Sequence, residues 1–313
     1  MHNAQCTLHN AKDTASRLAC LPWVTRAGVR LKPSDRARMS VLEPVMWRGP
    51  GFGVFDEGSR YERFMGRWSE RLAPLLVTFA DVRDDQLVLD VGSGTGSLAR
   101  SVIDCVPSAR VIGMEPARAF ARHARAHTQS TSVQYVVGAL PTIPHPGASF
   151  DRVLALLVLN FVSDRAAALR EMIRVTRPGG IIAAAVWDYG GGMEMLRVFW
   201  DEAVSADPAA GSRDERHMPL CRRGELGALW RAHGLTAVEE PVLSVDARFE
   251  SFDDFWLPFL GGQGPAGMYV NGRAPAAREA LQHKLRQRVL PDHPDGEIVM
   301  TLRAWAVKGV VEA

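Results

Sequence analysis

Asp90, Gly92, Gly94 and Gly96 stand at alternate positions and form the segment of this chain best suited to hold a nucleotide. A short β-branched and apolar run ends at Asp90, and a helix-compatible stretch follows the last glycine. Glycine has no Cβ, so it accepts positive φ and leaves room for a ligand against the main chain. The segment therefore predicts a strand, a tight turn and a helix start that let the backbone approach a nucleotide.

A carboxylate follows at the end of the next expected strand, residues 110–115, about 20 positions beyond the glycine turn. An ionised Glu115 only accepts hydrogen bonds, so it suits a ligand with donor groups. The spacing D-x-G-x-G-x-G differs from the G-x-G-x-x-G of dinucleotide sites and so disfavours a nicotinamide-dependent oxidoreductase.

These two features together resemble the first motifs of the class I S-adenosylmethionine-dependent methyltransferases. The Arg-Pro-Gly-Gly at 177–180 and the segment 61–68 are similar to further parts of that family. The resemblance runs from about residue 55 to the C-terminus and is strongest over residues 88–187. It implies a cofactor site of Asp90, Gly92, Ser93, Gly94, Thr95 and Gly96 around the methionine part, Glu115 and Pro116 at the ribose, and Ala139 and Leu140 at the adenine.

The family often places an aspartate where this chain has Ala139. We therefore expect the backbone of Ala139 and Leu140, rather than a side chain, to contact the adenine.

The acceptor is expected at the C-terminal ends of the fourth and fifth strands, because open α/β sheets bind ligands there. Asn160 and Asp188 are the candidate catalytic residues, with Asp188 as the candidate base. Phe161 and Trp187 are candidate acceptor-binding residues. Tyr61 and Arg67, on the expected helix before the core, are further candidates for the binding site.

Strand-like and helix-like segments alternate through residues 86–188. This alternation predicts an α/β fold, a doubly wound and mostly parallel seven-stranded sheet of the Rossmann-like type. Strand character at 236–249 and 297–310 predicts an antiparallel edge. Between them, residues 250–295 are expected to form a helical lid over the substrate.

Residues 1–54 lack sustained periodicity and carry a basic excess. They are interpreted as a disordered or mis-assigned extension, with Met39 or Met46 as an alternative start, before a methyltransferase domain at 55–313. The remainder is slightly acidic, which disfavours nucleic acid as a partner. No apolar run approaches the ~20 residues that span a bilayer. Four scattered cysteines predict neither a metal site nor disulfides, and they favour a cytoplasmic protein.

The sequence therefore predicts transfer of a methyl group from S-adenosylmethionine to a small-molecule acceptor by in-line displacement. A module that binds the cofactor without turnover stays open as an alternative, since no base is certain. The sequence specifies neither the acceptor nor the oligomeric state.

Overall fold

The computed structural model describes residues 62–312. Both the expected extension at residues 1–54 and the candidate Tyr61 lie outside this range.

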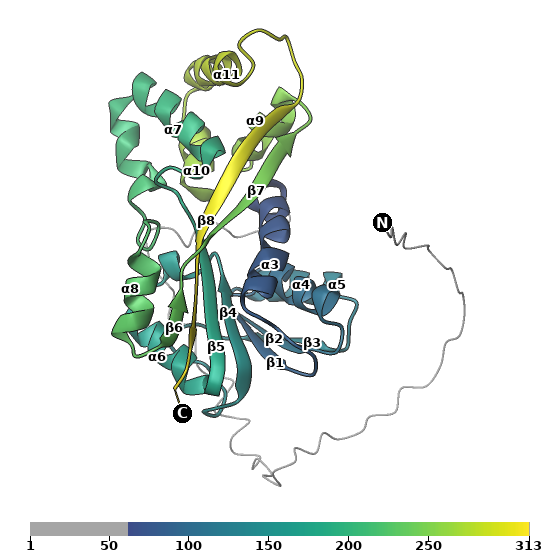
Figure 1. The fold of residues 1–313 in the computed structure, drawn as a ribbon. Coiled ribbons are helices and arrows are strands. Elements are labelled where there is room, and N and C mark those ends of the chain that lie inside the picture. Colours follow the sequence, from purple (N-terminus) through teal and green to yellow (C-terminus); the bar gives the residue numbers. More distant parts are fainter. Residues whose placement is uncertain (1–61, 313) are drawn as a thin grey trace, which may run out of the picture. The chain divides into compact units, whose positions relative to one another are not determined.

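A mixed sheet forms the centre of the described chain (Figure 1). Its strands run in the order β3-β2-β1-β4-β5-β8-β6, and β7 pairs with β8 beyond this path. Strands β1 to β5 are parallel, whereas β8 is antiparallel to its three partners. The bounds are β1 (Leu87–Val91), β2 (Arg110–Glu115), β3 (Val133–Val137), β4 (Phe150–Leu156), β5 (Thr176–Trp187), β6 (Thr236–Glu239), β7 (Val242–Phe249) and β8 (Ile298–Val310).

The sheet has eight strands rather than the expected seven, because the expected strand at 236–249 is divided in two. Pro241 lies at the division. Proline has no N–H to donate to a strand ladder, so it ends the regular pairing of β6 with β8.

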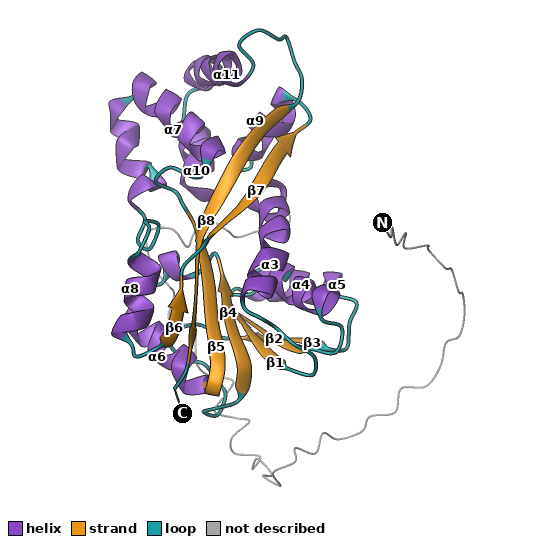
Figure 2. Ribbon diagram, in the orientation of Figure 1, coloured by secondary structure: helices purple, strands orange, loops and turns teal. Residues whose placement is uncertain are grey.

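Helices cover both faces of the sheet (Figure 2). On one face pack α3 (Arg67–Phe79), α4 (Ser97–Cys105) and α5 (Arg118–His127); on the other pack α6 (Arg165–Val175) and α8 (Glu225–Ala232). Neighbouring residues of one strand serve different faces: Val88 is buried in the first core and Leu89 in the second. Strand β4 is buried along its whole length, as its unbroken apolar run predicts.

A group of helices, here named the cap, packs around the part of the β7–β8 ribbon that extends out of the sheet (Figure 1). It comprises α7 (Glu194–Ala206), η4 (Pro208–Arg213), η5 (Glu215–His217), α9 (Phe252–Leu260), α10 (Gly264–Asn271) and α11 (Pro275–Val289). Aromatic rings fill its interior; those of Phe199 and Phe259 stack with centroids 4.6 Å apart. The same core continues to the π-helix η2 (Glu62–Gly66), where Phe64 packs edge-on against Phe259.

Within residues 62–312, no helix is both long and apolar enough to cross a membrane.

Candidate cofactor and acceptor site

The glycine turn between β1 and α4 is tied to the end of β2. The backbone N–H groups of Gly92 and Ser93 both donate to the carbonyl of Met114, at 2.8 and 3.0 Å. All three glycines have positive φ, at 69°, 53° and 93° for Gly92, Gly94 and Gly96. L-residues with side chains rarely adopt this conformation, so the spacing in the sequence reflects a backbone requirement.

The three glycines differ in what surrounds them. A Cβ on Gly92 would lie 2.6 Å from a methyl group of Val158, and one on Gly96 would collide with the Tyr135 hydroxyl. A Cβ on Gly94 would have nothing closer than 4.0 Å, so this residue faces open space. Gly92 and Gly96 thus allow close packing, whereas Gly94 leaves room for a ligand.

Glu115 ends β2 beside this open space, with only 5% of the residue exposed. Its two carboxylate oxygens accept hydrogen bonds from the backbone N–H groups of Gly94, at 2.9 Å, and Ala117, at 2.8 Å. Burial raises the pKa of Glu115, and these two N–H groups partly offset that rise. A carboxylate has about four acceptor positions, so each oxygen can accept a further bond from a ligand.

Asp90 lies one position before the end of β1 and is almost fully buried. Neither carboxylate oxygen makes a hydrogen bond of normal geometry within the described chain. Burial, and then the negative charge of Glu115, raise the pKa of Asp90 to about 7. The two buried carboxylates make this edge of the sheet strongly electronegative.

A cavity opens at the C-terminal edge of the parallel strands, where the fold predicts ligand binding. Of the candidate residues, Gly92, Gly94, Glu115, Pro116, Ala139, Leu140, Phe161 and Trp187 line it. The other candidates of the glycine turn, Asp90, Ser93, Thr95 and Gly96, are not among the residues that line it. The wall also contains residues that the motifs do not indicate: Met65, Val91, Met114, Ala117, Phe120, Gly138, Leu156, Leu157, Val158, Val162 and Tyr189.

Tyr189 was predictable from the rule that selects Trp187, since it follows the end of β5 by two residues. Met65 and Phe120 come from helices whose apolar residues mostly pack in cores, so their sequence positions carry no such signal.

Asp188 does not line the cavity. One carboxylate oxygen pairs with the Arg303 guanidinium at 2.8 Å, and the other accepts from the Gly191 N–H at 3.0 Å. Asn160 lies in η3 (Leu159–Phe161), is 3% exposed, and leaves both its amide oxygen and its amide nitrogen without partners.

Arg67, a candidate for the binding site, instead joins α3 to the cap. It donates to Asp254 at 2.8 and 3.0 Å, and its guanidinium lies over the rings of Trp68 and Phe249. These contacts account for Arg67 as a packing residue.

The cavity fits S-adenosylmethionine by the chemistry of its wall. Glu115 can accept from a ribose diol, Gly94 leaves space beside it, and Pro116, Phe120 and Leu140 offer apolar surface to a purine.

Comparison with known proteins identifies the family to which this fold belongs. A methyltransferase domain family matches residues 89–184. The chain is 38% identical over 199 residues to the malonyl-[acyl-carrier protein] O-methyltransferase of Yersinia pestis, covering 62% of this chain and 69% of that protein. It is 30% identical over 247 residues to an uncharacterised protein of Mycobacterium tuberculosis, covering 77% and 83% of the two chains.

Solved structures share the fold. The YcgJ protein of Bacillus subtilis superposes with a TM-score of 0.52 at 19% identity, covering 78% of this chain and 99% of that one. The phosphoethanolamine N-methyltransferase 2 of Haemonchus contortus, in complex with S-adenosylmethionine, gives 0.51 at 18% identity, covering 82% and 57%. The chain belongs to the class I S-adenosylmethionine-dependent methyltransferases, and S-adenosylmethionine is its cofactor.

Proposed function

We propose that this methyltransferase acts on a small, partly apolar or aromatic acceptor bound beside Phe161, Trp187 and Tyr189. The observation that supports this most directly is the wall of the cavity at the ends of β4 and β5. It is formed there by these three aromatic residues together with Leu156 and Leu157. Apolar walls with few polar groups are typical of sites for small organic ligands.

The acceptor atom is proposed to be an oxygen that is already deprotonated at working pH. Glu115 is the only ionisable carboxylate, amine or imidazole among the described residues of the wall, and we assign it to the ribose rather than to the acceptor. When bound, the cofactor supplies an activated methyl group, so a nucleophile without a proton needs no base. The similarity to a protein named as an O-methyltransferase supports oxygen as the acceptor atom.

Asp188 is proposed to position the acceptor wall rather than to remove a proton. Besides its side-chain contacts, its backbone carbonyl accepts from the N–H groups of Gly192 and Met193. Asp188 therefore fixes the turn that presents Trp187 and Tyr189 to the cavity. Correct orientation of two reactants contributes on the order of 7–11 kcal/mol to such reactions.

Asn160 is proposed to orient a polar group of the acceptor. Its amide is buried without partners, which costs about 1–3 kcal/mol unless a ligand supplies them. Its neighbours Val158, Phe161 and Val162 all line the cavity.

The test combines calorimetric titration with S-adenosylhomocysteine, using NAD as the control ligand, and a screen of carboxylic acids and acidic phenols, which are deprotonated at neutral pH, with methyl-labelled S-adenosylmethionine. We expect binding of S-adenosylhomocysteine but not NAD, and label transfer to at least one acceptor. Phe161→Leu should raise the KM for that acceptor and leave the affinity for S-adenosylhomocysteine unchanged. Cofactor binding without transfer to any acceptor would favour a non-enzymatic binding module.

A further inference from the structure

Glu62 is the first residue of η2, a π-helical turn that leads directly into α3. π-Helical turns are rare and occur frequently at functional sites, because they place side chains that a regular helix would not. The side chain at the start of this turn is the carboxylate of Glu62.

The Glu62 side chain folds back over its own turn. A Cβ on Gly66 would collide with the Glu62 carboxylate, whose Cδ would lie only 2.7 Å away. Glycine at position 66 therefore leaves the space that the carboxylate occupies. The conformation of Glu62 depends on a residue four positions later that has no side chain.

Glu62 has no partner for one of its oxygens. Its Oε1 is buried and accepts no hydrogen bond within the described chain. Nor does Glu62 cap the following helix, since the start of α3 at Gly66 has no side-chain capping bond. A buried carboxylate oxygen without a donor is costly, so neither packing nor capping explains this arrangement.

Glu62 belongs to the turn that contributes Met65 to the wall of the cofactor cavity. Met65, three residues later, lines that cavity, and so does Phe120 of α5. The charge of Glu62 acts on His123, which lies on α5 one turn beyond Phe120. Glu62 is therefore near the wall formed by η2 and α5, whereas the proposed acceptor wall comes from β4 and β5.

No described cation neutralises Glu62. Burial, and then the neighbouring His127, lower the pKa of His123, so His123 is mainly neutral at pH 7. Arg100, the other cation near His123, donates instead to the Thr95 carbonyl at 2.7 Å and to Glu70 at 2.9 Å. The described residues thus hold an anionic acceptor on the turn that carries Met65, and they provide no positive partner for it.

We propose that Glu62 binds the α-ammonium group of the cofactor's methionine part. An ammonium group has three N–H donors and a positive charge, which matches a carboxylate with a free, desolvated oxygen. The proposal rests on the S-adenosylmethionine site described above and adds a binding residue that the glycine motif does not include.

The test is calorimetric titration of wild type and Glu62→Gln with two ligands, S-adenosylhomocysteine and 5′-methylthioadenosine, which lacks the amino-acid part. We expect Glu62→Gln to weaken S-adenosylhomocysteine binding by roughly 10- to 100-fold, as for a charge-assisted hydrogen bond. Binding of 5′-methylthioadenosine should change by less than about twofold, since that ligand has no ammonium group. His123→Gln is the matched control and should leave the ratio of the two affinities unchanged.

Gly66→Ala provides a second variant, because its methyl group would displace the Glu62 carboxylate. It should also weaken the binding of S-adenosylhomocysteine more than that of 5′-methylthioadenosine. Equal losses for both ligands, or no loss for either, would overturn the proposed role of Glu62. If His123→Gln changed the ratio of the two affinities as much as Glu62→Gln does, Glu62 would be a partner of His123 rather than of the ligand, and the proposal would be overturned. If wild type bound 5′-methylthioadenosine but not S-adenosylhomocysteine, the cofactor site itself would be wrong, and Glu62 with it.

Discussion

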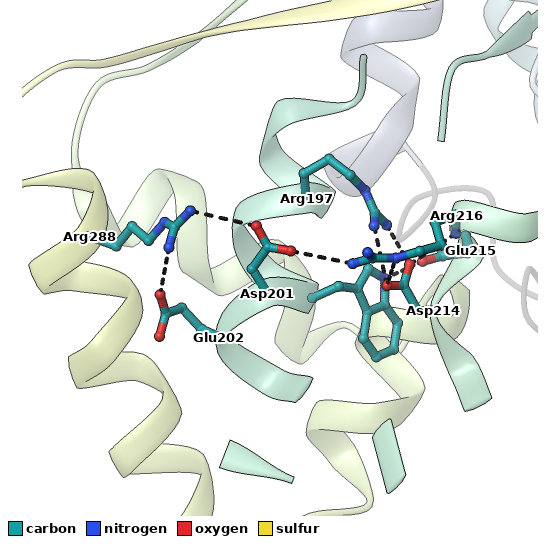
Figure 3. Close-up of polar contacts among 8 residues, drawn as sticks. Arg197, Asp201, Glu202, Asp214, Glu215, Arg216 and Arg288 are labelled. Atoms are coloured by element: carbon teal, nitrogen blue, oxygen red, sulfur yellow. Dashed lines mark hydrogen bonds and ion pairs between the residues drawn. The ribbon is translucent and has the colours of Figure 1, made fainter. Parts of the chain in front are cut away.

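Buried carboxylates occur at the cofactor edge of the sheet and in the cap, but their partners differ. In the cap, Asp214 accepts hydrogen bonds from Arg197 and Arg216 (Figure 3). Burial alone would raise the pKa of Asp214, yet the bonds from the two arginines outweigh it and lower the pKa below its usual value. At the cofactor edge, among residues 62–312, Glu115 has only backbone N–H partners and Asp90 has no partner of normal geometry.

The cap carboxylates belong to a network that joins three segments. In Figure 3, Arg288 of α11 pairs with Asp201 of α7, and Asp201 pairs with Arg216 of η5. Glu215 accepts from the indole N–H of Trp200. Asp214, which is paired with two arginines, keeps its charge at neutral pH, whereas carboxylates left without cations at the cofactor edge keep acceptor capacity for a ligand.

The largest expected effect is loss of stability in the cap. Asp214→Ala should lower the free energy of unfolding by about 3–5 kcal/mol, because Arg197 becomes a buried charge without a partner. Urea denaturation measures this. Asp246→Ala is the control, since Asp246 pairs with Arg248 between exposed side chains, and it should cost less than about 1 kcal/mol. Equal losses in the two variants would show that the buried pair contributes no more than the exposed pair.

A smaller effect, confined to binding, is expected at the cofactor edge. Glu115→Gln should weaken the binding of S-adenosylhomocysteine by roughly 10- to 100-fold, because a neutral amide accepts hydrogen bonds less strongly from a ribose diol. Calorimetry measures the affinity. Glu239→Gln removes an exposed partner of Lys308 and should leave the affinity unchanged. An unaltered affinity in Glu115→Gln would show that Glu115 does not bind the ribose.

The pH dependence of stability should distinguish Asp90 from an ordinary surface aspartate. Its pKa is raised in the folded state to about 7, so its contribution to stability is complete below about pH 4 and is lost as the pH rises through 7. Asp90→Asn should therefore exceed wild type in unfolding free energy at pH 8 by roughly 1–3 kcal/mol. The two proteins should be similar near pH 4. A variant that is less stable at pH 8 would contradict this account.

The smallest effect is expected at Glu215. Burial raises the pKa of Glu215 from its ordinary value of 4.5 to about 7, which is a smaller rise than that of Asp90 from 3.8. Its contribution to stability is likewise lost as the pH rises through 7. Glu215→Gln keeps an oxygen that accepts from Trp200, so it should gain roughly 1–2 kcal/mol of stability at pH 8 relative to wild type. Thermal unfolding across pH 5–8 measures this. A gain that does not depend on pH would mean that Glu215 does not titrate in this range.

Local patterns predicted the cofactor edge well. The strand at 110–115 has the expected bounds, and Glu115 ends it beside Gly94. Both depend on short-range rules: alternating apolar residues select strands, and glycine selects positive φ. Ala139 and Leu140 also line the cavity as expected, because they follow directly from the end of β3.

The same patterns could not assign Arg67 and Asp188. Each pairs with a residue far along the chain, Asp254 and Arg303, at separations of 187 and 115 positions. A charged residue near a strand end or on a helix looks equally suited to a ligand or to such a partner. Only the packing of the cap and of β8 against the core decides between them.

The sequence by itself determined the class of fold, the glycine turn and the carboxylate of Glu115 that ends β2 beside this turn, because these rest on spacing within about 30 residues. Tertiary structure decided which charges are available for chemistry. It pairs Asp188 and Arg67 with distant residues. Within the described residues, it leaves polar atoms of the buried Asp90 and Asn160, and one enclosed oxygen of Glu62, without hydrogen-bond partners. The physical reason is that desolvation and pairing depend on segments that meet only when the whole chain folds.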